Sequence, residues 1–269
     1  PAYNEPGITR VLDSLAGCHK PGCGTEVIVV VNAQTDAPSG SLEINRQTIS
    51  DIDQWKSSQS GCCFNLFIID VTPFRIPGWG VGAARKTGMD EAVRRFNALD
   101  RPDGVIVSLD ADCVVEANYL TALCNDLYKR GKCSACSIYF ELPLSGDEFS
   151  EDYYKAISLY ELHLRYYNQG LVYAGFPFAY HTIGSAMAVK AEKYVKAGGM
   201  NRRQAGEDFY FIQKLVPAGG YFNLNSTTVH PSPRSSYRVP FGTGATIKKM
   251  AGGMSGFLLS YNIRAFRDL

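Results

Sequence analysis

The stretch VIVSLDADCVVEANYL, residues 105–120, decides how the fold is interpreted. It opens with an apolar run typical of a buried strand, and the run stops at two carboxylates, Asp110 and Asp112. Ligands of open α/β sheets bind beyond the carboxyl ends of the strands. The i, i+2 spacing in extended chain points both side chains to the same side. No basic residue lies nearby in the sequence to offset their repulsion, so we expect a hard divalent cation, Mg²⁺ or Mn²⁺, beside them.

Apolar runs and helical patterns alternate on both sides of this stretch. The predicted strands are TEVIVVVN, FNLFIID, GVIVSLD, SACSIYFEL and GSAMAV, and the predicted helices are Ile8 to Leu15, Ile44 to Lys56, Val81 to Phe96 and Ala117 to Leu127. Continuous apolar strands indicate burial on both faces. The pattern therefore predicts an α/β protein whose central sheet is mixed, mostly parallel and flanked by helices. No repeat or linker marks a boundary, which favours a single domain.

Composition narrows the class of protein. The chain has 269 residues, 45% of them hydrophobic and 20% charged, as in soluble globular proteins. A formal net charge of +1 gives no reason to expect a nucleic-acid partner. No apolar run reaches the roughly 18 residues of a transmembrane helix.

The eight cysteines are too sparse for a disulfide scaffold and predict a reducing compartment. The spacings Cys18/Cys23 and Cys133/Cys136 leave a zinc site as an alternative, although buried or loop thiols are favoured because a zinc site usually needs two pairs held in turns.

Two enzyme families place an Asp-x-Asp motif after an apolar strand. LDADCV resembles the motif of haloacid-dehalogenase-like phosphatases, in which the first aspartate is the nucleophile and the second a general acid. On this alternative Asp110 would be the nucleophile. Those enzymes usually place the motif near the chain start and follow it with a GD-rich motif. Here it begins at residue 110 and the later acidic motif is GED.

The second resemblance extends over most of the chain. The segments PAYNE, VIVVVNAQTD, GWGVGAARKTGMDEA, SLDADC and AGGMNRRQAGEDFYFIQKL follow in order. In these segments and in their order, the sequence resembles family 2 glycosyltransferases, inverting enzymes that use nucleotide-sugar donors.

The resemblance implies a single GT-A (Rossmann-like) domain over residues 1–269, with a nucleotide-binding half at about 1–115 and an acceptor-binding half at about 116–269. Because PAYNE follows the first strand in that family, we expect a first strand before Pro1.

The resemblance also implies roles on the donor side. Asp112 would hold a divalent metal that bridges the diphosphate, and Asp110 would contact the ribose or the water shell of the metal. Arg85 occupies the arginine position of the family's A-R-N motif, where a guanidinium forms paired hydrogen bonds to the base or a phosphate, and Gly78, Gly80 and Gly82 would let the backbone approach a ligand. The implied donor-binding residues are Pro1, Tyr3, Glu5, Asn32, Asp36, Arg85, Asp110, Asp112, Arg234 and Arg238. Family members commonly end the second segment's strand in two aspartates. Asn32 stands there instead, which leaves the base open, with uracil the first choice.

The GED motif carries the implied catalytic roles. Glu207 and Asp208 begin an amphipathic helical pattern, where the helix dipole favours ionised carboxylates. The family assigns the aspartate as general base, so Asp208 would deprotonate the acceptor, while Glu207 would orient the acceptor or Asp208. A late histidine, His230, is the candidate third metal ligand, and Arg234 and Arg238 are candidates for closing over the diphosphate.

The resemblance further implies a hexosyltransferase of polysaccharide biosynthesis that acts on a glycan or lipid-linked acceptor. It implies a cytoplasmic location, free or in peripheral contact with the inner face of the membrane. The aromatic-rich segment 151–181 lies where the family places acceptor-binding elements, although core packing is the commoner use of such residues. A non-catalytic nucleotide-sugar-binding protein remains a third interpretation.

Overall fold

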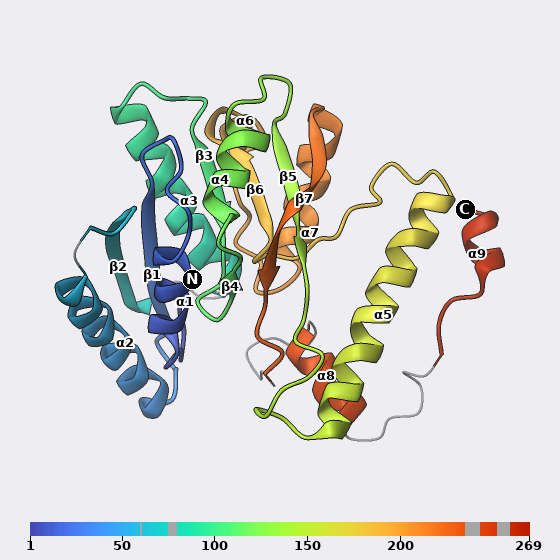
Figure 1. Ribbon diagram of the computed structural model, residues 1–269, viewed down its shortest axis with the longest axis horizontal. Coiled ribbons are helices and arrows are strands. Elements are labelled where there is room, and N and C mark those ends of the chain that lie inside the picture. The colour runs from blue at the N-terminus through green and yellow to red at the C-terminus, as the bar shows by residue number, and fades with distance from the viewer. Residues whose placement is uncertain (60, 75–79, 235–242, 252–258) are drawn as a thin grey trace. The chain divides into compact units, whose positions relative to one another are not determined.

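The computed structural model describes residues 1–59, 61–74, 80–234, 243–251 and 259–269. The chain forms two compact units (Figure 1). Unit 1 contains Pro1–Tyr139 and Thr182–Val229, and unit 2 contains Phe140–His181 and His230–Leu269. The division into a nucleotide-binding half at about 1–115 and an acceptor-binding half at about 116–269 stays a prediction.

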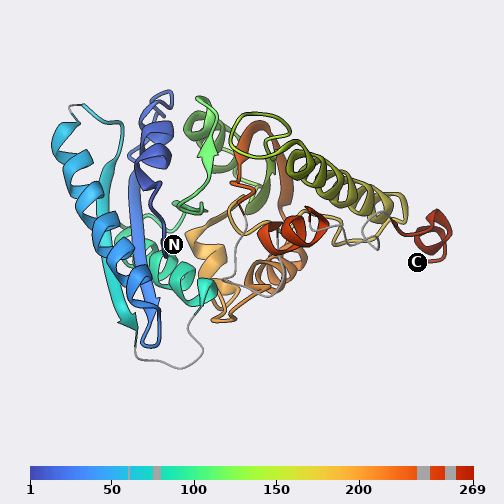
Figure 2. The same cartoon turned by 90° about the horizontal axis from the view of Figure 1, so that it is seen from below.

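The first part of unit 1 is a two-stranded parallel sheet covered by helices. It contains α1 (Ile8–Ala16), β1 (Glu26–Gln34), α2 (Ser39–Ser58), β2 (Asn65–Phe74) and α3 (Val81–Ala98). β1 and β2 pair in parallel with Val31 opposite Asp70, and Ala2 bridges to Val31 in the same sense. α2 runs alongside the two strands, and α3 also packs on β1 (Figure 2). Parallel pairing brings the carboxyl ends of both strands to one edge.

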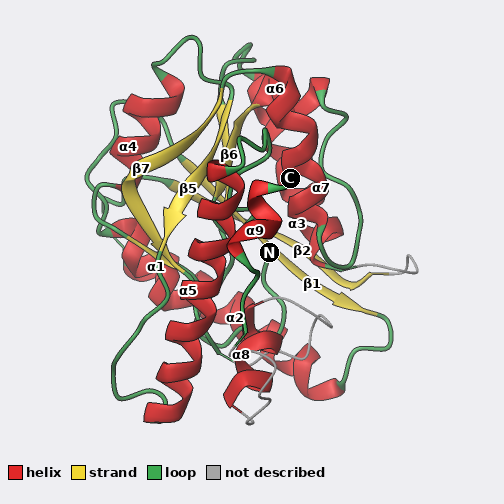
Figure 3. Cartoon of the chain, turned by 90° about the vertical axis from the view of Figure 1, so that its right-hand side faces the viewer, coloured by secondary structure: helices red, strands yellow, loops and turns green. Residues whose placement is uncertain are grey.

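A second sheet of five strands completes unit 1. In order across the sheet, its strands are β3 (Val105–Ser108), β6 (Met187–Lys190), β5 (Ala135–Phe140), β7 (Tyr221–His230) and β4 (Val114–Val115). β6 runs antiparallel to both β3 and β5, and Figure 3 shows β6, β5 and β7 side by side. The predicted α/β class with a mixed sheet is confirmed.

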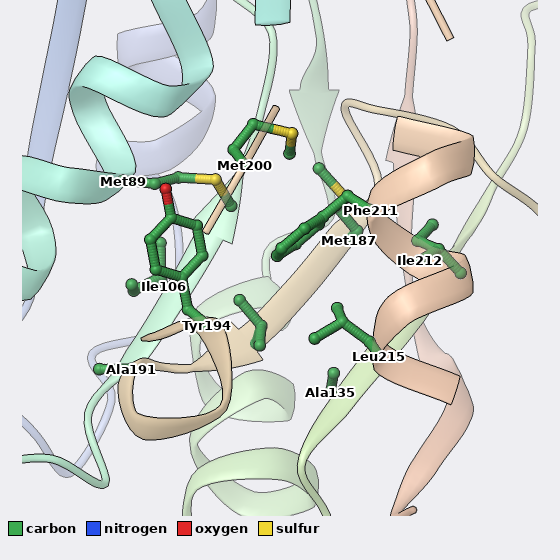
Figure 4. Packing of buried hydrophobic residues seen from close by; sticks show 11 residues of the cluster. Met89, Ile106, Ala135, Met187, Ala191, Tyr194, Met200, Phe211, Ile212 and Leu215 are labelled. Atoms are coloured by element: carbon green, nitrogen blue, oxygen red, sulfur yellow. The ribbon is translucent and has the colours of Figure 1, made fainter. Parts of the chain in front are cut away.

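One hydrophobic core joins this sheet to the helices around it. The remaining helical elements of unit 1 are α4 (Tyr119–Leu123) with the π-turn Cys124–Tyr128, α6 (Ala191–Lys196), and α7 (Glu207–Leu215) with the 3-10 turn Val216–Ala218. Met89 of α3, Ile106 of β3, Met187 of β6 and Phe211 of α7 pack in the same cluster (Figure 4). Burying a side chain of this size stabilises the fold by about 1.5–3 kcal/mol. The cluster therefore holds α3 and α7 firmly against the strand that precedes Asp110.

Unit 2 is helical in its described part. It contains α5 (Glu151–Tyr173), α8 (Thr243–Ala251) and α9 (Ile263–Arg267), and both short helices pack on α5. Ser150 caps α5 by accepting a hydrogen bond from the backbone N–H of Tyr153. Among the described residues, no helix has both the length and the apolar character of a membrane span.

Candidate active site

The Asp-x-Asp motif forms a turn just beyond β3. The backbone N–H of Cys113 donates to the carbonyl of Asp110 at 3.1 Å, and the N–H of Ala111 donates to the carbonyl of Pro1 at 3.3 Å. Ligating atoms of Asp110, Asp112 and Cys113 lie within 4.8 Å of one another. Two carboxylate oxygens at this separation are the hard ligands that Mn²⁺ and Mg²⁺ take, so the residues fit the predicted cation.

Cys113 was not among the predicted site residues. Its thiol is buried and donates a hydrogen bond to Asp112 Oδ1 at 3.5 Å. Its position directly after Asp112 is the signal in the sequence that could have indicated it. All eight cysteines are free. In the described parts of the chain, neither Cys18/Cys23 nor Cys133/Cys136 joins a group of three potential metal ligands.

A buried ion-pair network connects this turn to the start of α7. Arg85, in the first turns of α3, donates from Nη2 to Asp110 Oδ1 at 2.6 Å and from Nη1 to Glu207 Oε1. The side chains of Arg85 and Glu207 are 5% and 3% exposed, whereas that of Asp110 is 31% exposed. Burial lowers the pKa of the Arg85 guanidinium, but the attraction of Asp110 and Asp208 outweighs this and the net direction is upward. Arg85 is therefore charged at all physiological pH values.

Two glycines allow this network to form. A Cβ on Gly184 would lie 2.6 Å from Cζ of Arg85, and a Cβ on Gly82 would lie 2.4 Å from the carbonyl of Arg203. Gly78, Gly80 and Gly82 were expected to let the backbone approach a ligand. In the structure Gly82 approaches the segment that leads into α7, and Gly78 lies outside the described residues.

Gly184→Ala is expected to lower the free energy of unfolding by about 1–3 kcal/mol, because the added methyl group would force the guanidinium away from its carboxylates. Urea unfolding measures this change. Gly24→Ala is the control, since a Cβ there meets nothing within 4 Å. Equal stability of the two variants would contradict the close packing of Gly184 on Arg85.

Asp208 lies beside Glu207 at the start of α7. Its Oδ1 accepts the backbone N–H of Phe209 at 2.7 Å. The side-chain amide of Asn201 donates to the carbonyl of Glu207 at 2.9 Å and thereby holds this end of the helix. Burial raises the pKa of Asp208 above its ordinary value, and the positive charge of Arg85 opposes the rise. A half-buried carboxylate with a raised pKa is a stronger base than a solvated one.

Two side chains of α2 form hydrogen bonds with the backbone of the predicted donor-binding segments near the chain start. Asn45, which is buried, accepts the backbone N–H of Asn4 and donates to the carbonyl of Asn32, both at 2.9 Å. The hydroxyl of Thr48 donates to the carbonyl of Glu5 at 2.9 Å. These contacts place the Tyr3–Glu5 turn next to the end of β1. Asn45 was not predicted as a site residue, although a polar residue on the buried face of a helix could have indicated it.

The other predicted residues come from the turn after β1, from the end of β7 and from the segment that follows β7. Asp36 is exposed in the turn after β1. His230 is the last residue of β7. His230 and Arg234 both belong to unit 2, and Arg238 lies outside the described residues. Their roles stay predictions.

Comparison with solved structures identifies the architecture. The chain aligns with the mannosyltransferase PcManGT from Pyrobaculum calidifontis, solved in complex with GDP-Man and Mn²⁺, over 88% of its own length, with a TM-score of 0.55 and 16% identity. The chain has a GT-A-type fold. It also aligns with GalNAc-T7, solved with UDP, GalNAc and Mn²⁺, over 84% of its length, with a TM-score of 0.50 and 15% identity.

The GT-A-type chain spans 56% and 41% of the lengths of these two proteins. At such identities the likeness establishes the fold alone. No family model and no curated protein matches the sequence. Neither of the two solved structures is a phosphatase, so the comparison gives that alternative no support.

Proposed function

We propose that this chain is a metal-dependent glycosyltransferase that moves a hexose from a nucleotide-sugar donor, with a UDP-sugar the first choice, to a glycan or lipid-linked acceptor with inversion. The observation that carries the proposal is the network in which Arg85 connects the Asp110 turn to Glu207, beside Asp208, within a GT-A-type fold. Both solved structures contain Mn²⁺ together with a nucleotide or a nucleotide sugar. These ligands support the proposed class of donor and the proposed cation.

Each carboxylate has a distinct part in the proposed reaction. Asp110 and Asp112 would hold Mn²⁺ or Mg²⁺, which offsets the negative charge that develops on the leaving diphosphate. Asp208 accepts the proton of the acceptor hydroxyl as the oxygen bonds to the anomeric carbon. The bond from that carbon to the diphosphate breaks, and its electron pair leaves with the nucleoside diphosphate. Attack from the face opposite the leaving group inverts the configuration.

The remaining predicted residues keep their proposed roles. His230 is the candidate third metal ligand, and Arg234 and Arg238 are candidates for contacting the diphosphate. In unit 2, the side chains of Tyr160, His163 and Tyr261 line a pocket of about 480 Å³. That volume lies in the range of small-ligand sites, and the aromatic residues in its lining suit contact with a sugar or lipid.

Donor binding is expected to raise the melting temperature. A UDP-sugar at 100 times its Kd, with Mn²⁺, would stabilise the fold by about 2.7 kcal/mol, which corresponds to a rise of about 5 °C or more. A thermal-shift series of UDP- and GDP-sugars measures the effect, with EDTA in place of Mn²⁺ as the control. No shift with any of these donors would contradict the proposed function. Formation of an aspartyl-phosphate analogue at Asp110 with BeF₃⁻ would favour the phosphatase alternative.

A further inference from the structure

We propose that Arg85 is a positioning residue that fixes the metal-binding turn to the catalytic helix α7, and that it does not contact the donor. The inference rests on the proposed function. It departs from the role that the A-R-N resemblance implies, because the structure places the guanidinium between two carboxylates of its own chain.

The exposure of the side chains argues against donor contact. Arg85 is 5% exposed, and both of its terminal nitrogens already pair with carboxylates, Nη2 with Asp110 and Nη1 with Glu207. Gly184 packs on the guanidinium so closely that a Cβ there would lie 2.6 Å from Cζ, Nη1 and Nη2 of Arg85. A ligand in solvent therefore reaches the 31%-exposed Asp110 before it reaches Arg85.

The geometry of the guanidinium explains how one residue can position two parts of the site. The group is planar and rigid, so carboxylates bound to its two terminal nitrogens are held at a fixed separation. Asp110 begins the metal-binding turn, and Glu207 immediately precedes the proposed base, Asp208. The distance between a cation bound at Asp110 and the proposed base, Asp208, therefore depends on Arg85.

The charges of the network make this link necessary. Glu207 is 3% exposed, and without Arg85 its carboxylate would be a buried anion close to Asp110 and Asp208. Burying an uncompensated charge is strongly unfavourable, so α7 would shift to bring Glu207 into water. Displacing a catalytic group by about 1 Å can cost about 100-fold in rate.

Arg85→Lys tests the proposal, since lysine keeps the charge but has a single nitrogen that cannot bind both carboxylates at the same separation. We expect kcat to fall about 100-fold while the KM for the donor changes less than about 3-fold. Glu207→Gln should show the same pattern. The double variant should lose little more than either single one, because the two residues act as a unit. Arg94→Lys is the matched control, because Arg94 lies on the same helix with a 67%-exposed side chain paired to Glu91.

Each alternative gives a different result. A donor KM that rises 10-fold or more in Arg85→Lys with kcat preserved would make Arg85 a donor ligand and overturn the inference. A lower melting temperature with unchanged kcat and KM would make its role purely structural, which also overturns it. Absence of transfer by the wild type and by Arg94→Lys as well would remove the proposed function itself.

Discussion

Asp208→Asn is expected to reduce kcat by about 100- to 10,000-fold, the range typical for removal of a general base. The amide has nearly the shape of the carboxylate but cannot take a proton from the acceptor hydroxyl. Its oxygen still accepts the N–H of Phe209, so the start of α7 should be retained. Initial rates with a saturating nucleotide sugar and Mn²⁺ measure the loss. Asp53→Asn, on an exposed position of α2, is the control.

The same substitution should leave the protein equally stable or more stable at neutral pH. Burial raises the pKa of Asp208 in the folded state, so the folded chain binds its proton more tightly than the unfolded chain does. The tighter proton binding stabilises the folded chain at pH values below the pKa that Asp208 has in the unfolded chain. This stabilisation is lost as the pH rises through the higher pKa that Asp208 has in the folded chain. An uncharged Asn avoids the cost of burying the ionised carboxylate.

Two outcomes would count against the assignment of Asp208. One is normal transfer by Asp208→Asn, and the other is a loss of activity that accompanies unfolding. The pH profile gives an independent measurement. Wild-type kcat/KM should fall as pH decreases through the raised pKa of Asp208, at a higher pH than for an ordinary aspartate, and the residual activity of the variant should lack this limb.

Local patterns were sufficient to predict the main elements of unit 1. The apolar runs correspond to β1, β2, β3, β5 and β6, because each lies in a sheet whose burial shows directly in residue type. α3 begins at Val81, where it was predicted to begin. By contrast, α2 starts at Ser39 and not at Ile44, because its first turn, SGSLE, is too polar to show a helical apolar pattern.

The contacts that build the site could not be predicted in the same way. Arg85 and Glu207 are 122 positions apart, and nothing in either motif indicates that one pairs with the other. The resemblance assigned each motif a separate role toward the substrate. For Arg85 we propose a different role, because its guanidinium is 5% exposed and pairs with two carboxylates of its own chain. Asn45 was missed for the related reason that its contacts with Asn4 and Asn32 depend on tertiary packing, whereas Cys113 contacts its own neighbour, Asp112.

Asp112→Asn is the second large effect that we expect. Replacing one of two metal-binding carboxylates removes both a charge and a strong oxygen ligand. The loss of roughly 4 kcal/mol of transition-state stabilisation corresponds to about 1,000-fold in kcat/KM. Asp103→Asn is the matched control, because Asp103 precedes the same strand, is 51% exposed and pairs with Arg101.

Binding and stability measurements separate loss of the cation from loss of the fold. In the absence of metal, Asp112→Asn should melt close to the wild-type temperature, because Arg85 already offsets the charge of the neighbouring Asp110 and asparagine has nearly the shape of aspartate. With Mn²⁺ and a UDP-sugar, the variant should lose the thermal shift of the wild type, whereas Asp103→Asn should keep it. A full Mn²⁺-dependent shift in Asp112→Asn would place the cation elsewhere, because a ligand that stabilises the fold equally in both proteins does not depend on that carboxylate.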